Sequence, residues 1–151
     1  MSVVDDLRAQ IDAGRIIFDN AQAGQAAKLR RELLGQNAGT KVTTALQTLA
    51  LEVSRLQRIR ISSIIRSGSS SRHVTGRAFD VGNEEVAGAL LPQIATDERV
   101  NEFGIDEIIF DARVAGEANR NKWNYDRGQK HNYDDGTLRE HRNHIHFAVM
   151  G

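Results

Sequence analysis

The chain has 151 residues, of which 40% are hydrophobic and 26% are charged, a balance typical of a globular protein. Its 20 Lys and Arg residues equal its 20 Asp and Glu residues, so the formal net charge is zero and no nucleic-acid partner is predicted. Cysteine is absent, which excludes disulfide bonds, thiolate metal sites and a cysteine nucleophile. The length predicts a single domain over residues 1–151.

We expect neither a secretory signal peptide nor a membrane-spanning segment in this sequence. Residues 1–14 contain two early acids and no long apolar run, which argues against a secretory signal peptide. No stretch approaches the roughly 18 apolar residues that a membrane-spanning helix needs. We therefore expect synthesis in the cytoplasm and no membrane span. Action in the periplasm or on a cell wall would require release or injection.

Three helical patterns and one short apolar run occupy the first third of the chain. Ser2 and Asp5 have the spacing of a helix start. We expect helices over residues 2–14, 21–34 and 40–56, with a short strand over 15–18. Residues 1–56 would thus form a helical N-terminal part, which carries no motif and is a candidate docking surface for a partner.

The remainder of the chain has the pattern of short strands separated by helices and loops. A helix capped by Asn83 should end at Pro92, and a second short helix should close near Gly104. Residues 66–72, RSGSSSR, are expected to form a polar loop. Strands are expected over residues 59–65, 78–81, 105–110 and 145–149. Because the helices come first and the strands follow, the predicted class is α+β, with a small antiparallel sheet packed against N-terminal and central helices.

Residues 111–143 differ from the rest of the chain because they are polar and rich in Asn, Gly and charge. A long irregular segment inside a compact domain is usually functional or disordered, and we expect this one to be irregular. Its large side chains Trp123 and Tyr125 would either line a cleft or pack the segment itself.

Four of the five histidines lie within the last 21 residues, at positions 131, 141, 144 and 146. On a strand over residues 145–149, His144, His146 and Ala148 would point to the open face, opposite the apolar side chains. Two imidazoles at this spacing can share a metal ion, or one can bind the metal while the other acts beside it. Taken alone, they can also be an exposed pair on an edge strand.

The remaining histidine, His73, belongs to the segment SRHVTGRAFD at residues 71–80. Phe79 and Val81 should face the core, so Asp80 points the other way and needs polar partners. His73, Asp80 and His146 are therefore predicted to hold one Zn²⁺ per chain. Two histidines, one carboxylate and a water leave an exchangeable position, which is typical of catalytic zinc sites, whereas Mg²⁺ and Ca²⁺ prefer more oxygen ligands.

Residues 71–80 match every fixed position of the S-x-H-x-x-G-x-A-x-D signature of the D-alanyl-D-alanine carboxypeptidase superfamily. That superfamily also contains lysostaphin-type peptidases and the hedgehog fold. Its second signature, H-x-H, resembles His144 and His146, and the additional His141 resembles the spacing in murein endopeptidases. The resemblance covers residues 58–150 and implies a zinc peptidase core there.

The resemblance also implies roles for residues around the metal ligands. His144, with His141, would assist the attacking water or the transition state. Arg66 would pair with a substrate carboxylate, and Ser71 would lie near the substrate. Many relatives carry a glutamate as general base where this chain has Asn143. The base would then be a histidine or one of three other carboxylates, namely Glu140, Asp106 or Asp111.

The expected function is that of a zinc-dependent peptidase, an endopeptidase or a carboxypeptidase, that hydrolyses peptide bonds of peptidoglycan. Its setting would be a phage lysis enzyme or an injected effector. The alternative is a non-catalytic zinc-containing binding module of the same fold.

Overall fold

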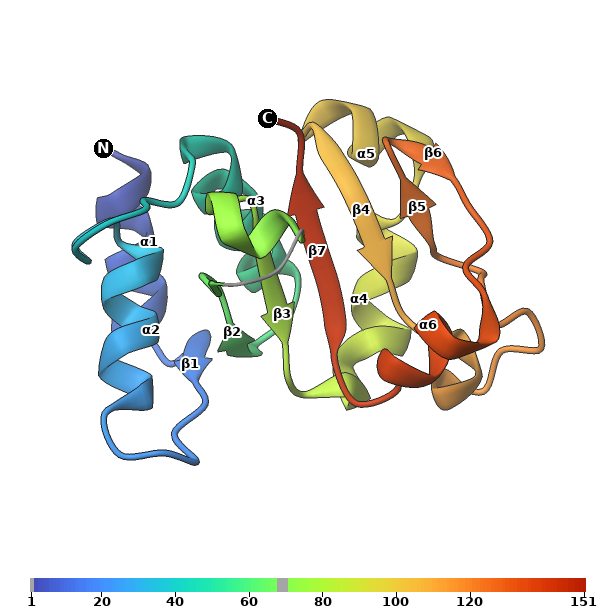
Figure 1. Ribbon diagram of the computed structural model, residues 1–151, viewed down its shortest axis with the longest axis horizontal. Helices are drawn as coiled ribbons and strands as arrows, with labels where there is room; N and C mark the ends of the chain where they lie inside the picture. The colour runs from blue at the N-terminus through green and yellow to red at the C-terminus, as the bar shows by residue number, and fades with distance from the viewer. Residues whose placement is uncertain (1, 68–70) are drawn as a thin grey trace.

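A computed structural model of the protein describes residues 2–67 and 71–151, so residues 68–70 of the expected polar loop lie outside the described part. The predicted α+β class is confirmed (Figure 1). The helices are α1 (Val3–Asp12), α2 (Gln25–Leu33), α3 (Thr44–Leu56), α4 (Ala87–Ile94), α5 (Asp97–Glu102) and α6 (Asp135–Glu140), with the 3₁₀ turns η1 (Arg72–Thr75), η2 (Glu84–Val86) and η3 (Ala112–Ala115). The strands are β1 (Ile16–Phe18), β2 (Ile59–Ser63), β3 (Ala78–Val81), β4 (Ile105–Ile109), β5 (Tyr125–Asp126), β6 (Gln129–Lys130) and β7 (Ile145–Val149).

These strands form one sheet in the order β1-β2-β3-β7-β4-β5-β6, with the C-terminal strand β7 at its centre (Figure 1). Strands β1 and β2 are parallel, and every other neighbouring pair is antiparallel. The sheet is therefore mostly antiparallel, as predicted. No helix in residues 2–67 or 71–151 combines the length and apolar character needed to cross a membrane.

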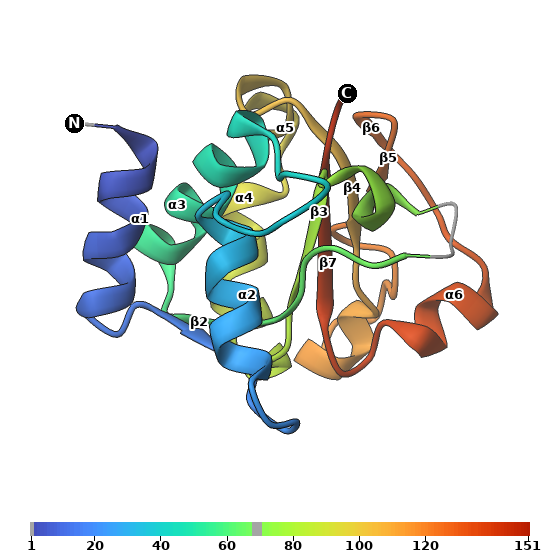
Figure 2. The ribbon, with the colours of Figure 1, turned by 60° about the vertical axis from the view of Figure 1, so that its left-hand side comes forward.

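The two faces of the central strands have different coverings. Figure 2 shows α1, α3 and α4 on one side of β3 and β7, and α6 on the other. On the helix-covered face, Phe79 and Phe147 stack with ring centroids 5.4 Å apart, and both side chains are fully buried. These rings belong to one hydrophobic core that extends from Leu7 in α1 to Val149 in β7. The opposite face carries Asp80 and His146, with the small side chains of Ala78 and Ala148 beside them.

Local sequence signals explain where the N-terminal helices begin. The Ser2 hydroxyl accepts a hydrogen bond from the Asp5 N–H, and the Thr43 hydroxyl accepts one from the Leu46 N–H. Each is an N-cap that satisfies a backbone donor at the first turn. The second helix begins later than predicted, because Gly24 adopts a left-handed backbone (φ +79°) directly before Gln25. Docking of a partner on residues 1–56 stays a prediction.

The predicted boundaries around Pro92 are wrong. Pro92 lies inside α4, and the helix ends two residues later, at Ile94. Burial of Leu90, Leu91 and Ile94 in the core outweighs the cost of a proline near the helix end. The side chain of Asn83 does not cap this helix, because its Oδ1 accepts a hydrogen bond from the Arg60 N–H at 2.7 Å.

Residues 111–143 are more ordered than predicted, since they contain η3, the β5–β6 hairpin and α6. Asn124 is fully buried, and its Oδ1 accepts a hydrogen bond from the Phe110 N–H at 2.8 Å. Trp123 and Tyr125 belong to the hydrophobic core, so they pack the segment rather than line a cleft. Polar residues order this segment through hydrogen bonds to the edge of β4, which a hydrophobic pattern does not reveal.

Gly76 ends the turn η1 that carries His73 and packs against the segment before α3. It has φ +71°, and a Cβ added there would overlap the backbone oxygen of Lys41. The Thr43 N–H donates to the Gly76 carbonyl at 3.1 Å across the same contact. Glycine is therefore required at this position both for its backbone conformation and for the close approach of two chain segments.

Replacing Gly76 by alanine should destabilise the fold more than the same change at Gly104, which also has positive φ (+62°) but no atom within 4 Å of an added Cβ. We expect Gly104→Ala to cost about 1–2 kcal/mol from backbone conformation alone. Gly76→Ala should cost about 1–3 kcal/mol more because of the steric overlap. Urea unfolding of the two variants measures the difference, and equal costs would contradict the close packing at Lys41.

Candidate metal centre

The structure brings His73, Asp80 and His146 together on the polar face of the sheet. Asp80 in β3 and His146 in β7 are directly paired across the antiparallel ladder, and His73 reaches them from η1. One ligand atom from each residue lies within 4.8 Å of the others, and all three residues are buried. Two imidazole nitrogens and a carboxylate oxygen suit a divalent transition metal. This group could therefore hold a metal ion.

His73 is fixed by a hydrogen bond on the side of its ring away from Asp80. Its Nδ1 lies 2.6 Å from the Ile64 carbonyl oxygen, which can only accept, so Nδ1 carries the proton. Nε2 is therefore the ring nitrogen that faces Asp80, 3.2 Å from Oδ1, and the one that could bind a metal ion. A backbone carbonyl that orients the ring in this way is a common support for a metal-binding histidine.

The charges of the metal-free group are set by its short contacts. Burial would raise the pKa of Asp80, but hydrogen bonds from His146 and His73 hold it well below its usual range. Burial disfavours charge on His146 as well, yet its hydrogen bonds to Asp80 and Glu107 raise its pKa to about 9. Without metal, His146 is thus protonated at neutral pH, and a metal ion must displace that proton.

His141 and His144 lie beside this group, with ring centroids 4.8 Å apart, and the His141 ring is 6.0 Å from that of His146. The expected open face is wrong for His146, which is only 5% exposed, whereas His144 is half-buried. The Nδ1 of His141 donates to the Thr137 carbonyl at 2.7 Å, and that of His144 donates to Asn143 Oδ1 at 2.8 Å. Burial lowers the pKa of both imidazoles. Each ring therefore offers an unprotonated Nε2 near pH 7.

A groove opens next to these residues. It has a volume of about 370 Å³, and Asp80, His144 and Arg66 contribute to its lining. The Arg66 side chain is 53% exposed, and its guanidinium lies 3.9 Å from Asp80 Oδ2. Ser71 immediately precedes η1, where its carbonyl accepts a hydrogen bond from the Val74 N–H at 3.1 Å. The predicted arginine is thus at the site, and the predicted serine is at the start of the turn that carries His73.

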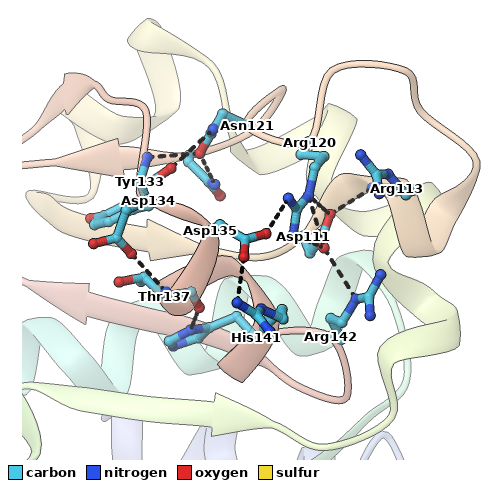
Figure 3. Close-up of polar contacts among 12 residues, drawn as sticks. Asp111, Arg113, Arg120, Asn121, Tyr133, Asp134, Asp135, Thr137, His141 and Arg142 are labelled. Carbon is cyan, nitrogen blue, oxygen red and sulfur yellow. Dashed lines mark hydrogen bonds and ion pairs between the residues drawn. The ribbon is translucent and has the colours of Figure 1, made fainter.

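Two of the three carboxylates considered as general bases are engaged elsewhere. Asp111 is fully buried, and its carboxylate binds Arg120 at 2.9 Å and Arg142 at 3.3 Å (Figure 3). Asp106 is also buried and binds Arg72 at 3.0 Å. Burial would raise the pKa of Asp111, but the hydrogen bond from Arg120 holds it below its ordinary value, so this carboxylate is a poor proton acceptor. Glu140, at the end of α6, is exposed.

The Asp111 cluster instead holds the segment that carries His141. The Asp111 N–H donates to the His141 carbonyl at 2.9 Å, and Arg120 also binds Asp135 in α6 at 2.7 Å. Figure 3 shows these ion pairs beside the His141 ring and its bond to Thr137. The cluster thus ties η3, α6 and the segment of His141 and Arg142 together.

One residue at the site was missed by sequence reasoning. Glu107 Oε1 lies 2.9 Å from His146 Nε2, and its side chain is 13% exposed. It pairs with Ala148 across β4 and β7, after an irregularity in register between Ile105 and Glu107. The signal available in the sequence was an acid inside an apolar strand, but the pairing partner and the irregularity depend on tertiary structure.

Comparison with known proteins found no matching family model, no matching curated protein and no matching solved structure.

The metal-free protein should lose stability as the pH rises. The folded-state pKa of His146, about 9, lies above its unfolded value of about 6.5. Its contribution is therefore fully present below pH 6.5 and is lost as the pH rises through 9. Thermal unfolding of chelated protein between pH 6 and 10 should show this loss in the wild type and a flatter profile in His146→Gln. Parallel profiles would contradict the assigned charge state.

Proposed function

We propose that this protein is a zinc-dependent peptidase that hydrolyses peptide bonds of peptidoglycan, as an endopeptidase or a carboxypeptidase. The observation that carries the proposal is the buried group of His73, Asp80 and His146, whose ligand atoms lie within 4.8 Å of one another beside a groove. The resemblance of residues 71–80 and of His144 with His146 to peptidoglycan peptidases supplies the substrate class.

Zinc is the metal that this donor set favours. Two imidazole nitrogens and one carboxylate oxygen make three protein ligands, which leaves a fourth tetrahedral position for water or substrate. Mg²⁺ and Ca²⁺ would require more oxygen donors than the group offers. When bound, zinc supplies Lewis acidity that polarises a scissile carbonyl and lowers the pKa of water.

The histidines beside the group provide proton transfer. His144 lines the groove and has an unprotonated Nε2, since its Nδ1 donates to Asn143. His141 is held in the same tautomer by Thr137. Because burial lowers the pKa of both rings, each can accept a proton at neutral pH. With Asp106 and Asp111 held in ion pairs, we assign the general base to this histidine pair, with His144 as the residue nearest the groove.

Arg66 is suited to bind a substrate carboxylate. It lines the groove, it is largely exposed, and its nearest acidic partner, Asp80, is 3.9 Å away. A guanidinium can bind a carboxylate through two parallel hydrogen bonds. A peptide ending in a free carboxylate, or carrying one near the scissile bond, fits this arrangement.

A non-catalytic zinc-containing module is the second candidate, and Asn143 is the observation that favours it. An amide cannot act as a base, and its oxygen is occupied by the hydrogen bond from His144. Mass spectrometry of defined muropeptides incubated with and without zinc separates the two candidates. A zinc-dependent product from one bond type supports the peptidase, whereas tight zinc binding with no product from any muropeptide supports the module.

The variant His144→Ala should bind zinc with unchanged stoichiometry and lose about 10²–10⁴-fold in kcat, because proton transfer is removed while the ligands stay. His131→Ala is the matched control, since His131 is exposed and its ring contacts Tyr133 rather than the metal group. Hydrolysis assays and metal analysis of both variants check this. Full activity in His144→Ala would contradict its assigned role.

A further inference from the structure

We propose that Glu107 is a positioning residue that makes Nδ1 of His146 the metal-binding atom, with Arg72 holding its carboxylate in place. The inference rests on the proposed zinc centre and adds to it a residue that neither sequence signature contains.

The two nitrogens of the His146 ring face different carboxylates. Nδ1 lies 3.0 Å from Asp80 Oδ1, on the side of the metal group, and Nε2 lies 2.9 Å from Glu107 Oε1. A neutral imidazole carries one ring proton, and only the nitrogen without it can bind a metal. A carboxylate can only accept, so Glu107 retains the proton on Nε2 when the metal displaces the one on Nδ1. Glu107 thereby leaves Nδ1 bare toward Asp80 and His73.

The position of Glu107 excludes it from the first coordination sphere of the same ion. The imidazole ring of His146 stands between its carboxylate and Asp80, and Glu107 is not part of the group whose ligand atoms lie within 4.8 Å. Its partner across the ladder, Ala148, is small and buried on the same side of β7 as His146. The short alanine side chain leaves room for the glutamate to reach along the strand to the imidazole.

Arg72 completes the arrangement from the turn that carries His73. Its Nη1 lies 3.4 Å from Glu107 Oε2, and its Nε donates to Asp106 Oδ2 at 3.0 Å. Each oxygen of the Glu107 carboxylate therefore has a partner, a ring nitrogen for one and a guanidinium for the other. Because Arg72 and His73 are adjacent in η1, the turn that delivers one metal ligand also fixes the support of another.

This support should appear in zinc affinity, measured by competition with a chelator of known affinity. We expect Glu107→Ala to bind zinc about 10–100-fold more weakly than the wild type, as for other losses of a hydrogen-bond partner behind a metal ligand. Glu107→Gln keeps an acceptor oxygen and should recover part of that loss. Glu85→Ala, an exposed acid in η2, is the matched control and should bind as the wild type does.

A second measurement reports the tautomer directly. Long-range ¹H–¹⁵N spectra of the histidine rings in zinc-loaded wild-type protein should show His146 protonated at Nε2 and metal-bound at Nδ1. This readout needs no variant, so it holds even if Glu107→Ala fails to fold. Protonation of His146 at Nδ1 would overturn the proposal, as would zinc binding by Glu107→Ala within twofold of the wild type.

Zinc binding and hydrolysis by the wild type distinguish a failure of the proposed function from a failure of the role of Glu107. A wild-type protein that binds no zinc would overturn the proposed function and this inference with it. A wild-type protein that binds zinc and hydrolyses muropeptides, while Glu107→Ala binds equally well, would overturn the role of Glu107 alone.

Discussion

The antiparallel pairing of β3 with β7 is the constraint on which the rest of the site depends. Its register places Asp80 directly opposite His146 and, one residue along, Phe79 opposite Phe147. The two faces of the ladder are therefore set together: stacked aromatic rings bind the strands to the helices, and polar side chains meet on the far side. A slip of one residue would bury the acid in the core and expose the aromatic rings. Packing of the hydrophobic core thus fixes how Asp80 and His146 meet on the polar face.

The histidines around Asp80 and His146 lie on separate segments, and polar contacts hold each of these segments in place. The turn η1 brings His73 to Asp80, and Gly76 allows that turn to pack against the backbone of Lys41. The Asp111 ion pairs hold the segment that presents His141. Buried polar contacts of this kind cost stability unless they are fully satisfied.

The sequence alone predicted the structure correctly where a local pattern of residues determines it. Alternation of apolar and polar residues predicted the strand over 145–149 with its observed bounds, and the three proposed metal ligands converge as the two motifs implied. Prediction from the sequence failed where contacts between distant segments determine the structure. Core packing carries α4 through Pro92, buried asparagine and arginine bonds order residues 111–143, and the β4–β7 register brings Glu107 to His146. A local periodicity in the sequence predicts none of these three features.

The proposed function requires that His73, Asp80 and His146 bind one catalytic zinc ion. Anomalous diffraction at the zinc absorption edge, from crystals of zinc-loaded protein, would locate that ion. We expect a single strong peak about 2.0–2.2 Å from His73 Nε2, an Asp80 carboxylate oxygen and His146 Nδ1, with a fourth position open to the groove. A peak bound elsewhere, or no peak among these three side chains, would contradict the claim.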